Sequence, residues 1–110
     1  MIKIYHNPRC SKSRQALEWL NKKGHAPEVV EYLKSPLSRE ELEGLVKILD
    51  GSPLEMIRKK DAPSGLKLES PDSVVEALVS HPQFMERPIV VAKGRAVVGR
   101  PFERIESLLS

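Results

Sequence analysis

Residues 2–30, IKIYHNPRCSKSRQALEWLNKKGHAPEVV, contain the pattern that decides the fold. Apolar and polar side chains alternate over residues 2–5, which predicts a short strand. Ala16, Leu17 and Leu20 lie on one face of a helix that is expected to start at about Ser11 and to end before Gly24, a residue type common after a helix C-terminus. Val29-Val30 then predict a second strand. The whole segment is expected to form a β-α-β unit with parallel strands and a right-handed crossover.

The middle of the chain is expected to be helical, and its start signals are serines. Ser38 with Glu41 forms a capping box, and Ser52-Pro53 repeats a helix start with proline at the first position. Ser70-Pro71 opens a further helix, whose inward-facing residues are expected to be Val74, Val75, Leu78 and Val79. Residues 60–67 are expected to form an exposed loop.

The last part of the chain predicts a β-hairpin followed by a helix. Residues 89–92 and 95–99 flank the two-residue turn Lys93-Gly94, and a final helix is expected from Arg100-Pro101. The order is β-α-β, helices, β-β-α, with no repeat or linker. We therefore expect one α/β domain over residues 1–110, with a mixed sheet of about four strands flanked by helices.

Composition limits the partners of the protein. The net charge of +3 is spread over 110 residues without a long basic run, so no nucleic-acid partner is expected. No stretch approaches the roughly 18 apolar residues that span a bilayer, and the first ten residues are too short and polar for a signal peptide. We expect a cytoplasmic protein without a membrane partner.

Cys10 is the only cysteine, which excludes an internal disulfide. A lone thiol is either a small buried apolar group or a reactive one. Its place between a strand and a helix favours the reactive thiol, because unpaired amides and the helix dipole stabilise a thiolate at a helix start. The nearby Arg9, Lys12 and Arg14 add positive charge. The same position suits an anionic substrate.

The segment Cys10-Ser11-Lys12-Ser13 has the C-x-x-S form of a monothiol redox site. Ser13 stands where a dithiol enzyme has its resolving cysteine, so a second thiol must come from outside the chain. His6 has two interpretations: an acid/base group or cation that supports the thiolate, or a turn histidine that bonds the backbone. Three scattered histidines and one cysteine lack metal-ligand spacing, so no metal site is expected.

The arginines and prolines carry no signal by themselves. General frequencies favour a trans bond before Pro88. On the residues alone, Arg58, Arg87 and Arg100 are three of 18 basic residues, most of which are expected to be solvated surface groups.

Several segments nevertheless occur together and in order, and their combination resembles the glutaredoxin-coupled arsenate reductase family. They are IYHNPRCSKSR (4–14), LSREELEGL (37–45), MIRKKD (56–61), HPQFMERPIVV (81–91) and VVGRPFERI (97–105). The resemblance implies a thioredoxin-like fold with a helical insertion between the β-α-β and β-β-α units, and a cis Pro88 facing the cysteine. Arg9 departs from the family pattern, in which a small residue is common before the cysteine.

The resemblance also implies an activity and a set of site residues. Arsenate is reduced to arsenite through a covalent thiol–arsenate adduct on Cys10, with glutathione as co-substrate, glutaredoxin as partner and no bound cofactor. By position, Arg58, Arg87 and Arg100 hold the arsenate or a similar oxyanion, since guanidinium groups bind its oxygens in pairs. The matching surroundings are His6, Asn7, Ser13 and Arg14.

Two other functions stay open on the sequence. The first is a glutathione-dependent thiol-disulfide oxidoreductase on the same fold, in which the arginines bind glutathione carboxylates. The second is a redox-type regulator that binds RNA polymerase. Such regulators usually carry a C-x-x-C switch, and Ser13 removes the second thiol here.

Overall fold

A four-stranded mixed sheet forms the centre of the protein in the computed structural model, which describes residues 2–63 and 68–110. The elements are β1 (Lys3–His6), α1 (Ser11–Lys22), β2 (Glu28–Glu31), α2 (Arg39–Ile48), η1 (Pro53–Met56), α3 (Pro71–Ser80), η2 (Pro82–Phe84), β3 (Ile89–Ala92), β4 (Arg95–Val98) and α4 (Glu103–Leu109). The strand order is β2-β1-β3-β4. Strand β1 is parallel to β2 and antiparallel to β3, and β3 is antiparallel to β4. The expected thioredoxin-like fold with a helical insertion is confirmed.

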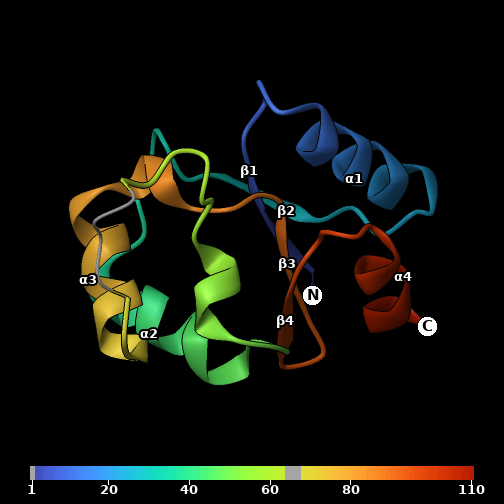
Figure 1. Ribbon diagram of the computed structural model, residues 1–110. Helices are drawn as coiled ribbons and strands as arrows, with labels where there is room; N and C mark the ends of the chain where they lie inside the picture. The colour runs from blue at the N-terminus through green and yellow to red at the C-terminus, as the bar shows by residue number, and fades with distance from the viewer. Residues whose placement is uncertain (1, 64–67) are drawn as a thin grey trace.

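Helices cover both faces of this sheet. In Figure 1, α1 and α4 lie on one side of the strands, and α2 and α3 lie on the other. Adjacent residues of β1 point to opposite layers, because side chains alternate along a strand. Ile4 packs with the side chains of α1 and α4, whereas Tyr5 packs with those of α2 and α3. The sheet thus separates two apolar clusters.

The first helix begins and ends where the sequence predicts. Helix α1 begins at Ser11 directly after Cys10 and ends in its C-cap, Lys23. Gly24 follows with a φ of 80°, and the N–H of His25 donates to the carbonyl of Leu20. This is the helix ending that favours glycine, because a side chain there meets its own backbone.

The hairpin turn also follows its sequence signal. Lys93 and Gly94 both have positive φ, 56° and 72°, which is the backbone of the tight turn that matches the twist of two antiparallel strands. Beyond the hairpin, the final helix begins at Glu103 and not at Arg100-Pro101 as predicted. Arg100 therefore lies in the connection between β4 and α4.

The helical insertion differs from the prediction in two details. Ser52 and Glu55 form the expected capping box, but η1 is a 3₁₀ turn of four residues, because Ile57 turns extended and pairs with Met85. Val79 was expected to face inward and is 38% exposed. At about 100° per residue, it lies roughly 120° from the centre of the buried arc of α3. Residues 60–63 are largely exposed, as expected, and the rest of that predicted loop lies outside the described residues.

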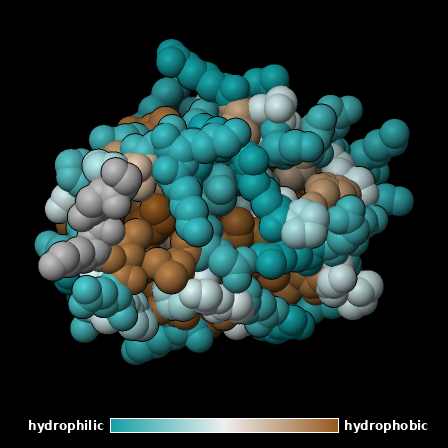
Figure 2. All heavy atoms as spheres, viewed as in Figure 1, coloured by the Kyte–Doolittle hydropathy of each residue, from teal (hydrophilic) through white to brown (hydrophobic). Residues whose placement is uncertain are grey.

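Hydrophilic side chains cover most of the face in Figure 2, and the hydrophobic ones that reach it gather mainly over the half with α2 and α3. Within the described ranges, no helix has the length and apolar character to cross a membrane.

Candidate active site

Cys10 lies at the point where the chain passes from β1 into α1. It is the N-cap residue of α1, in an extended conformation. Its own N–H donates to the carbonyl of Asn7 at 3.0 Å, and its carbonyl accepts the N–H of Arg14. The residue is partly exposed, and its thiol faces the backbone amides of Lys12 and Ser13 in the first helical turn.

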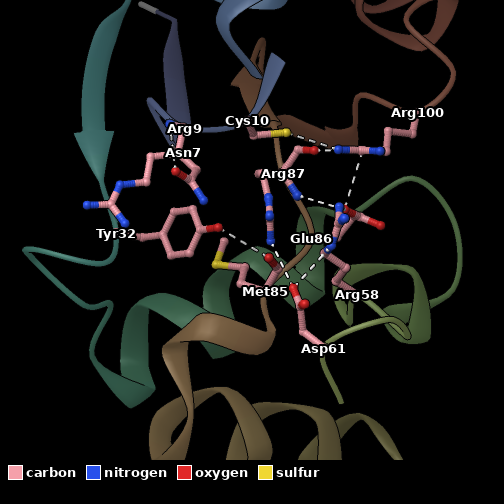
Figure 3. Close-up of polar contacts among 10 residues, drawn as sticks. All are labelled: Asn7, Arg9, Cys10, Tyr32, Arg58, Asp61, Met85, Glu86, Arg87 and Arg100. Atoms are coloured by element: carbon pink, nitrogen blue, oxygen red, sulfur yellow. Dashed lines mark hydrogen bonds and ion pairs between the residues drawn. The ribbon is translucent and has the colours of Figure 1, made fainter. Parts of the chain in front are cut away.

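The pKa of the Cys10 thiol lies below its ordinary value. Burial alone raises it, but the backbone N–H of Ser13, the Arg87 guanidinium, the N–H of Lys12 and the charge of Arg100 lower it by more. In Figure 3 the sulfur points at Arg100, whose Nη2 donates to Sγ at 3.2 Å. Hydrogen bonds and positive charge that favour the ionised form make the thiol a better nucleophile at neutral pH.

The cations that act on this thiol differ from the basic residues beside it in sequence. Arg9 is exposed, and Figure 3 shows its guanidinium pointing away from the sulfur. Arg14 is also exposed and donates to the carbonyl of Pro8 at 2.9 Å, so it supports the loop and not the thiol. The effective cations are Arg87 and Arg100, far along the chain.

Arg58 reaches the site through the pairing of the helical insertion with the segment before β3. Ile57 forms an antiparallel bridge with Met85. On either side of it, the N–H of Arg58 donates to Phe84 and the N–H of Glu86 donates to Met56, each at 2.7 Å. This pairing sets the Arg58 side chain next to Glu86 and on the same side of the molecule as Arg100 (Figure 3).

Two carboxylates hold the three arginines. Asp61 Oδ2 lies 3.1 Å from Arg58 Nε and 3.1 Å from Arg87 Nη1. Glu86 Oε1 lies 3.4 Å from Arg100 Nε and 3.7 Å from Arg58 Nη1. Arg100 Nε also donates to the carbonyl of Arg87 at 2.8 Å. One edge of the Arg100 guanidinium is thus anchored, which leaves Nη2 directed at the sulfur.

Two donors of these arginines lack a hydrogen bond to any described residue. Nε of Arg58 and Nε of Arg87 are buried without a hydrogen-bond partner among the described residues, although Arg58 Nε lies near Asp61. An unpaired buried donor is costly unless a ligand or water meets it. Three guanidinium groups and two carboxylates leave one net positive charge beside the sulfur, a balance that favours the thiolate form of Cys10.

His6, Asn7 and Ser13 form the support of the Cys10 loop. The Ser13 side chain is fully buried; its Oγ lies 2.7 Å from His6 Nδ1 and accepts the N–H of Asn7 at 3.1 Å. Burial lowers the pKa of His6, and the charge of Arg14 adds to this effect while Glu31 opposes it. His6 bonds a side chain and not the backbone, and its lowered pKa disfavours a cation; its part as an acid/base group stays a prediction.

Pro88 follows Arg87 through a cis peptide bond and is buried. This agrees with the family resemblance and not with the general frequency of trans prolines. A second cis bond precedes Pro101. The two arginines nearest the sulfur therefore each stand directly before a cis proline.

Three residues of this site carried no signal in the sequence analysis. They are Asp61, Glu86 and Tyr32. The three-residue spacing of Arg58 and Asp61 is a pattern typical of local ion pairs, and it was the available hint for Asp61. Tyr32 is 1% exposed, and its hydroxyl donates to the carbonyl of Met85 at 3.3 Å. Its ring lies beside Arg87 in Figure 3.

In the part of the chain that the structure describes, no group of three His, Cys, Asp or Glu side chains is placed to hold a metal ion. What the site offers is an activated thiolate next to convergent guanidinium donors. Such a pair can bind an oxyanion and attack it in the same place.

Known proteins share this arrangement of elements and sequence. The chain is 47% identical over 114 residues to an arsenate reductase of Neisseria meningitidis serogroup A, covering 98% of this chain and 97% of the relative. It is 46% identical over 113 residues to the uncharacterized protein YfgD of Escherichia coli K12, covering 94% and 92%. The solved structure of an arsenate reductase from Vibrio cholerae superposes with a TM-score of 0.83 at 40% identity, over 97% of this chain and 96% of that chain.

The family model named ArsC matches residues 5–108, a range that includes Cys10, all three site arginines and both carboxylates that hold them. With this match over nearly the whole sequence, the protein belongs to the ArsC family.

Proposed function

We propose that this protein reduces arsenate to arsenite, with the Cys10 thiolate as the nucleophile. The observation that carries the proposal is the contact of Arg100 Nη2 with Cys10 Sγ at 3.2 Å, in a thiol whose pKa is lowered. A relative with 47% identity is named an arsenate reductase. The site supplies what the reaction needs, a sulfur nucleophile and donors for a tetrahedral oxyanion.

In the first step of this proposal, the Cys10 thiolate attacks the arsenic of bound arsenate. A sulfur–arsenic bond forms, one arsenic–oxygen bond breaks, and the departing oxygen leaves as water after taking up protons from solvent. Arsenic stays pentavalent. Arg58, Arg87 and Arg100 hold the remaining oxygens and stabilise their charge as it develops, which is the effect that planar guanidinium groups supply best.

In the second step, an external thiolate attacks the sulfur of Cys10. A sulfur–sulfur bond forms, and the electron pair of the sulfur–arsenic bond stays on arsenic, which becomes trivalent and leaves as arsenite. Cys10 remains in a mixed disulfide with the donor. A further thiol then exchanges with this disulfide and restores Cys10. The external thiols are required because Cys10 is the only cysteine of the chain.

We propose glutathione as the first of these thiols and glutaredoxin as the source of the second. The reaction then belongs in the cytoplasm, where the glutathione pool keeps a lone thiol reduced. His6 and Ser13 shape the Cys10 loop in this scheme, because their buried hydrogen bond fixes the first turn of α1 on the end of β1.

The test is a coupled assay of the purified protein with arsenate, glutathione, glutaredoxin and a reducing system, with arsenite measured directly. We expect arsenite to form, and we expect arsenate but not sulfate to slow the alkylation of Cys10. Absence of arsenite under these conditions contradicts the proposal.

A second candidate is a glutathione-dependent thiol-disulfide oxidoreductase on the same site. It is favoured by Ser13, which is buried where a resolving cysteine would stand and leaves Cys10 to form mixed disulfides with external thiols. Rapid removal of glutathione from a glutathionylated test peptide, without arsenite formation from arsenate, selects this function.

A further inference from the structure

A pocket with a volume of about 410 Å³ opens beside the arginines, within the range of sites that bind small molecules. Its walls are Leu54, Glu55, Ile57, Arg58, Lys59, Lys60, Glu86, Val98 and Arg100. We propose that this pocket binds the external thiol donor, and that it selects a small anionic peptide thiol, the class to which glutathione belongs. The inference rests on the proposed function, since it assigns a place to the second substrate of that reaction.

The pocket adjoins the sulfur without containing it. Arg100 is one of its walls, and Nη2 of the same side chain lies 3.2 Å from Cys10 Sγ. Figure 3 shows Arg58, Glu86 and Arg100 on one side of the sulfur. A thiol held in the pocket is therefore one guanidinium away from Cys10. In the proposed reaction the oxyanion binds at the sulfur first, and the thiol donor waits in the pocket.

The charge of the walls suits carboxylates. The two acidic walls are already engaged, Glu55 with Arg104 and Glu86 with Arg58 and Arg100. Lys59 and Lys60 are exposed and form no ion pair with any described residue. Two unpaired ammonium groups at the rim match a ligand with two carboxylates, the number that a γ-glutamyl tripeptide carries beside its single ammonium group at neutral pH.

The pocket also has an apolar wall. Leu54 is 43% exposed, one of the few large apolar side chains of the described residues that reach solvent to this extent. It lines the pocket together with Ile57 and Val98. A cationic rim beside an aliphatic wall suits a short peptide with charged ends and an apolar middle, and it disfavours a small neutral thiol, which leaves both lysines unpaired.

A larger cavity elsewhere fits this role less well. Its volume is about 750 Å³, and its walls include His6, Pro8, Arg14 and Glu18. None of these walls is among the groups that lower the pKa of Cys10. Arg14 in this cavity is occupied by the carbonyl of Pro8.

The first test compares two thiols in the proposed reaction. Glutathione is anionic and 2-mercaptoethanol is neutral, and the ratio of their kcat/KM values measures the contribution of the pocket. We expect the variant with both Lys59→Gln and Lys60→Gln to lower this ratio roughly 2- to 10-fold, since exposed charge pairs contribute modestly. Lys47→Gln removes the same charge from the exposed face of α2 and serves as the matched control. An unchanged ratio in the double variant overturns the inference.

The second test needs no turnover. S-methylglutathione has the charges of glutathione but no free thiol, and its binding is followed through the backbone amide signals of the ¹⁵N-labelled protein. We expect shifts that concentrate at residues 54–60 and weaken with added salt. Shifts elsewhere, or none at millimolar ligand, overturn the inference. If arsenite fails to form while these shifts occur, the proposed function fails and the pocket assignment stands.

Discussion

The two halves of the candidate active site are built in opposite ways. The half that carries Cys10 is local: the contacts among His6, Asn7, Ser13 and Cys10 join residues at most seven positions apart. The half that carries the arginines is assembled from distant segments, with Arg87 paired to Asp61 across 26 positions and Arg100 to Cys10 across 90. Short-range structure positions the nucleophile, and the tertiary fold supplies the charge that activates it.

The largest effect is expected from the local half. Cys10→Ser removes the thiolate, and loss of a nucleophile typically costs at least about 1000-fold in kcat. Arsenite formation in the coupled assay measures this, and circular dichroism shows whether the variant stays folded. Residual activity near that of the wild type means that the proposed chemistry does not pass through Cys10.

The second largest effect is expected from the half of the site that carries the arginines. Arg100→Gln removes the guanidinium on the sulfur, and we expect kcat/KM for arsenate to fall on the order of 100-fold and the pKa of Cys10 to rise. Arg95→Gln removes an arginine that pairs with Asp50 at the surface, away from Cys10, and is the matched control. Equal effects of the two substitutions would show that general charge, and not the placement of Arg100, matters.

Ser13→Ala tests the support of the local half. It leaves the Asn7 N–H and His6 Nδ1 without their buried partner, which should lower the free energy of unfolding by about 1–3 kcal/mol. Chemical denaturation measures the change, with Ser11→Ala at an exposed position of the same helical turn as control. A loss no greater than that of Ser11→Ala contradicts the structural role of this bond.

Glu86→Gln separates two effects of the carboxylates. If Glu86 mainly moderates the positive charge, its neutral variant lowers the pKa of Cys10 further. We expect this result, with a rise of roughly 2- to 3-fold in the rate of alkylation below the pKa, because a partly exposed charge contributes little. A raised pKa would show instead that Glu86 acts by aiming Arg100. Iodoacetamide labelling across pH distinguishes the two directions.

The lowered pKa of Cys10 also predicts a small pH dependence of stability. The ordinary pKa of the thiol is 9.0, and the pKa in the folded protein is lower. The unfolded chain therefore holds the thiol proton more tightly than the folded chain does. The stabilisation by the thiolate is therefore complete above pH 9 and is lost as pH falls through the folded pKa. The free energy of unfolding of the wild type, relative to Cys10→Ser, should rise with pH up to that range. A flat difference contradicts the lowered pKa.

The same division explains what the sequence could predict. The Ser38–Glu41 capping box, the glycine after α1 and the Lys93-Gly94 turn were predicted correctly, because each depends on neighbours within a few residues. The place of Cys10 at a helix start was predicted for the same reason.

Contacts between distant segments have no such short-range pattern in the sequence. The residues alone assigned the activating charge to Arg9, Lys12 and Arg14, whereas the structure assigns it to Arg87 and Arg100. Those arginines, and the cis bond before Pro88, came only from the resemblance between segments in family order. Asp61 and Glu86 lie within two of the matched segments but received no role there, and Tyr32 lies outside all of these segments.

The bridge between Ile57 and Met85 has a consequence for motion. Two backbone hydrogen bonds, from the amides of Arg58 and Glu86, tie the segment after η1 to the segment before β3 at this point. Ile57 and Met85 are both buried, so opening of this junction requires packed apolar side chains to separate, and native proteins open least readily where such contacts are dense. The hydrogen–deuterium exchange rates of these two amides therefore report how often Arg58 parts from the segment that carries Glu86.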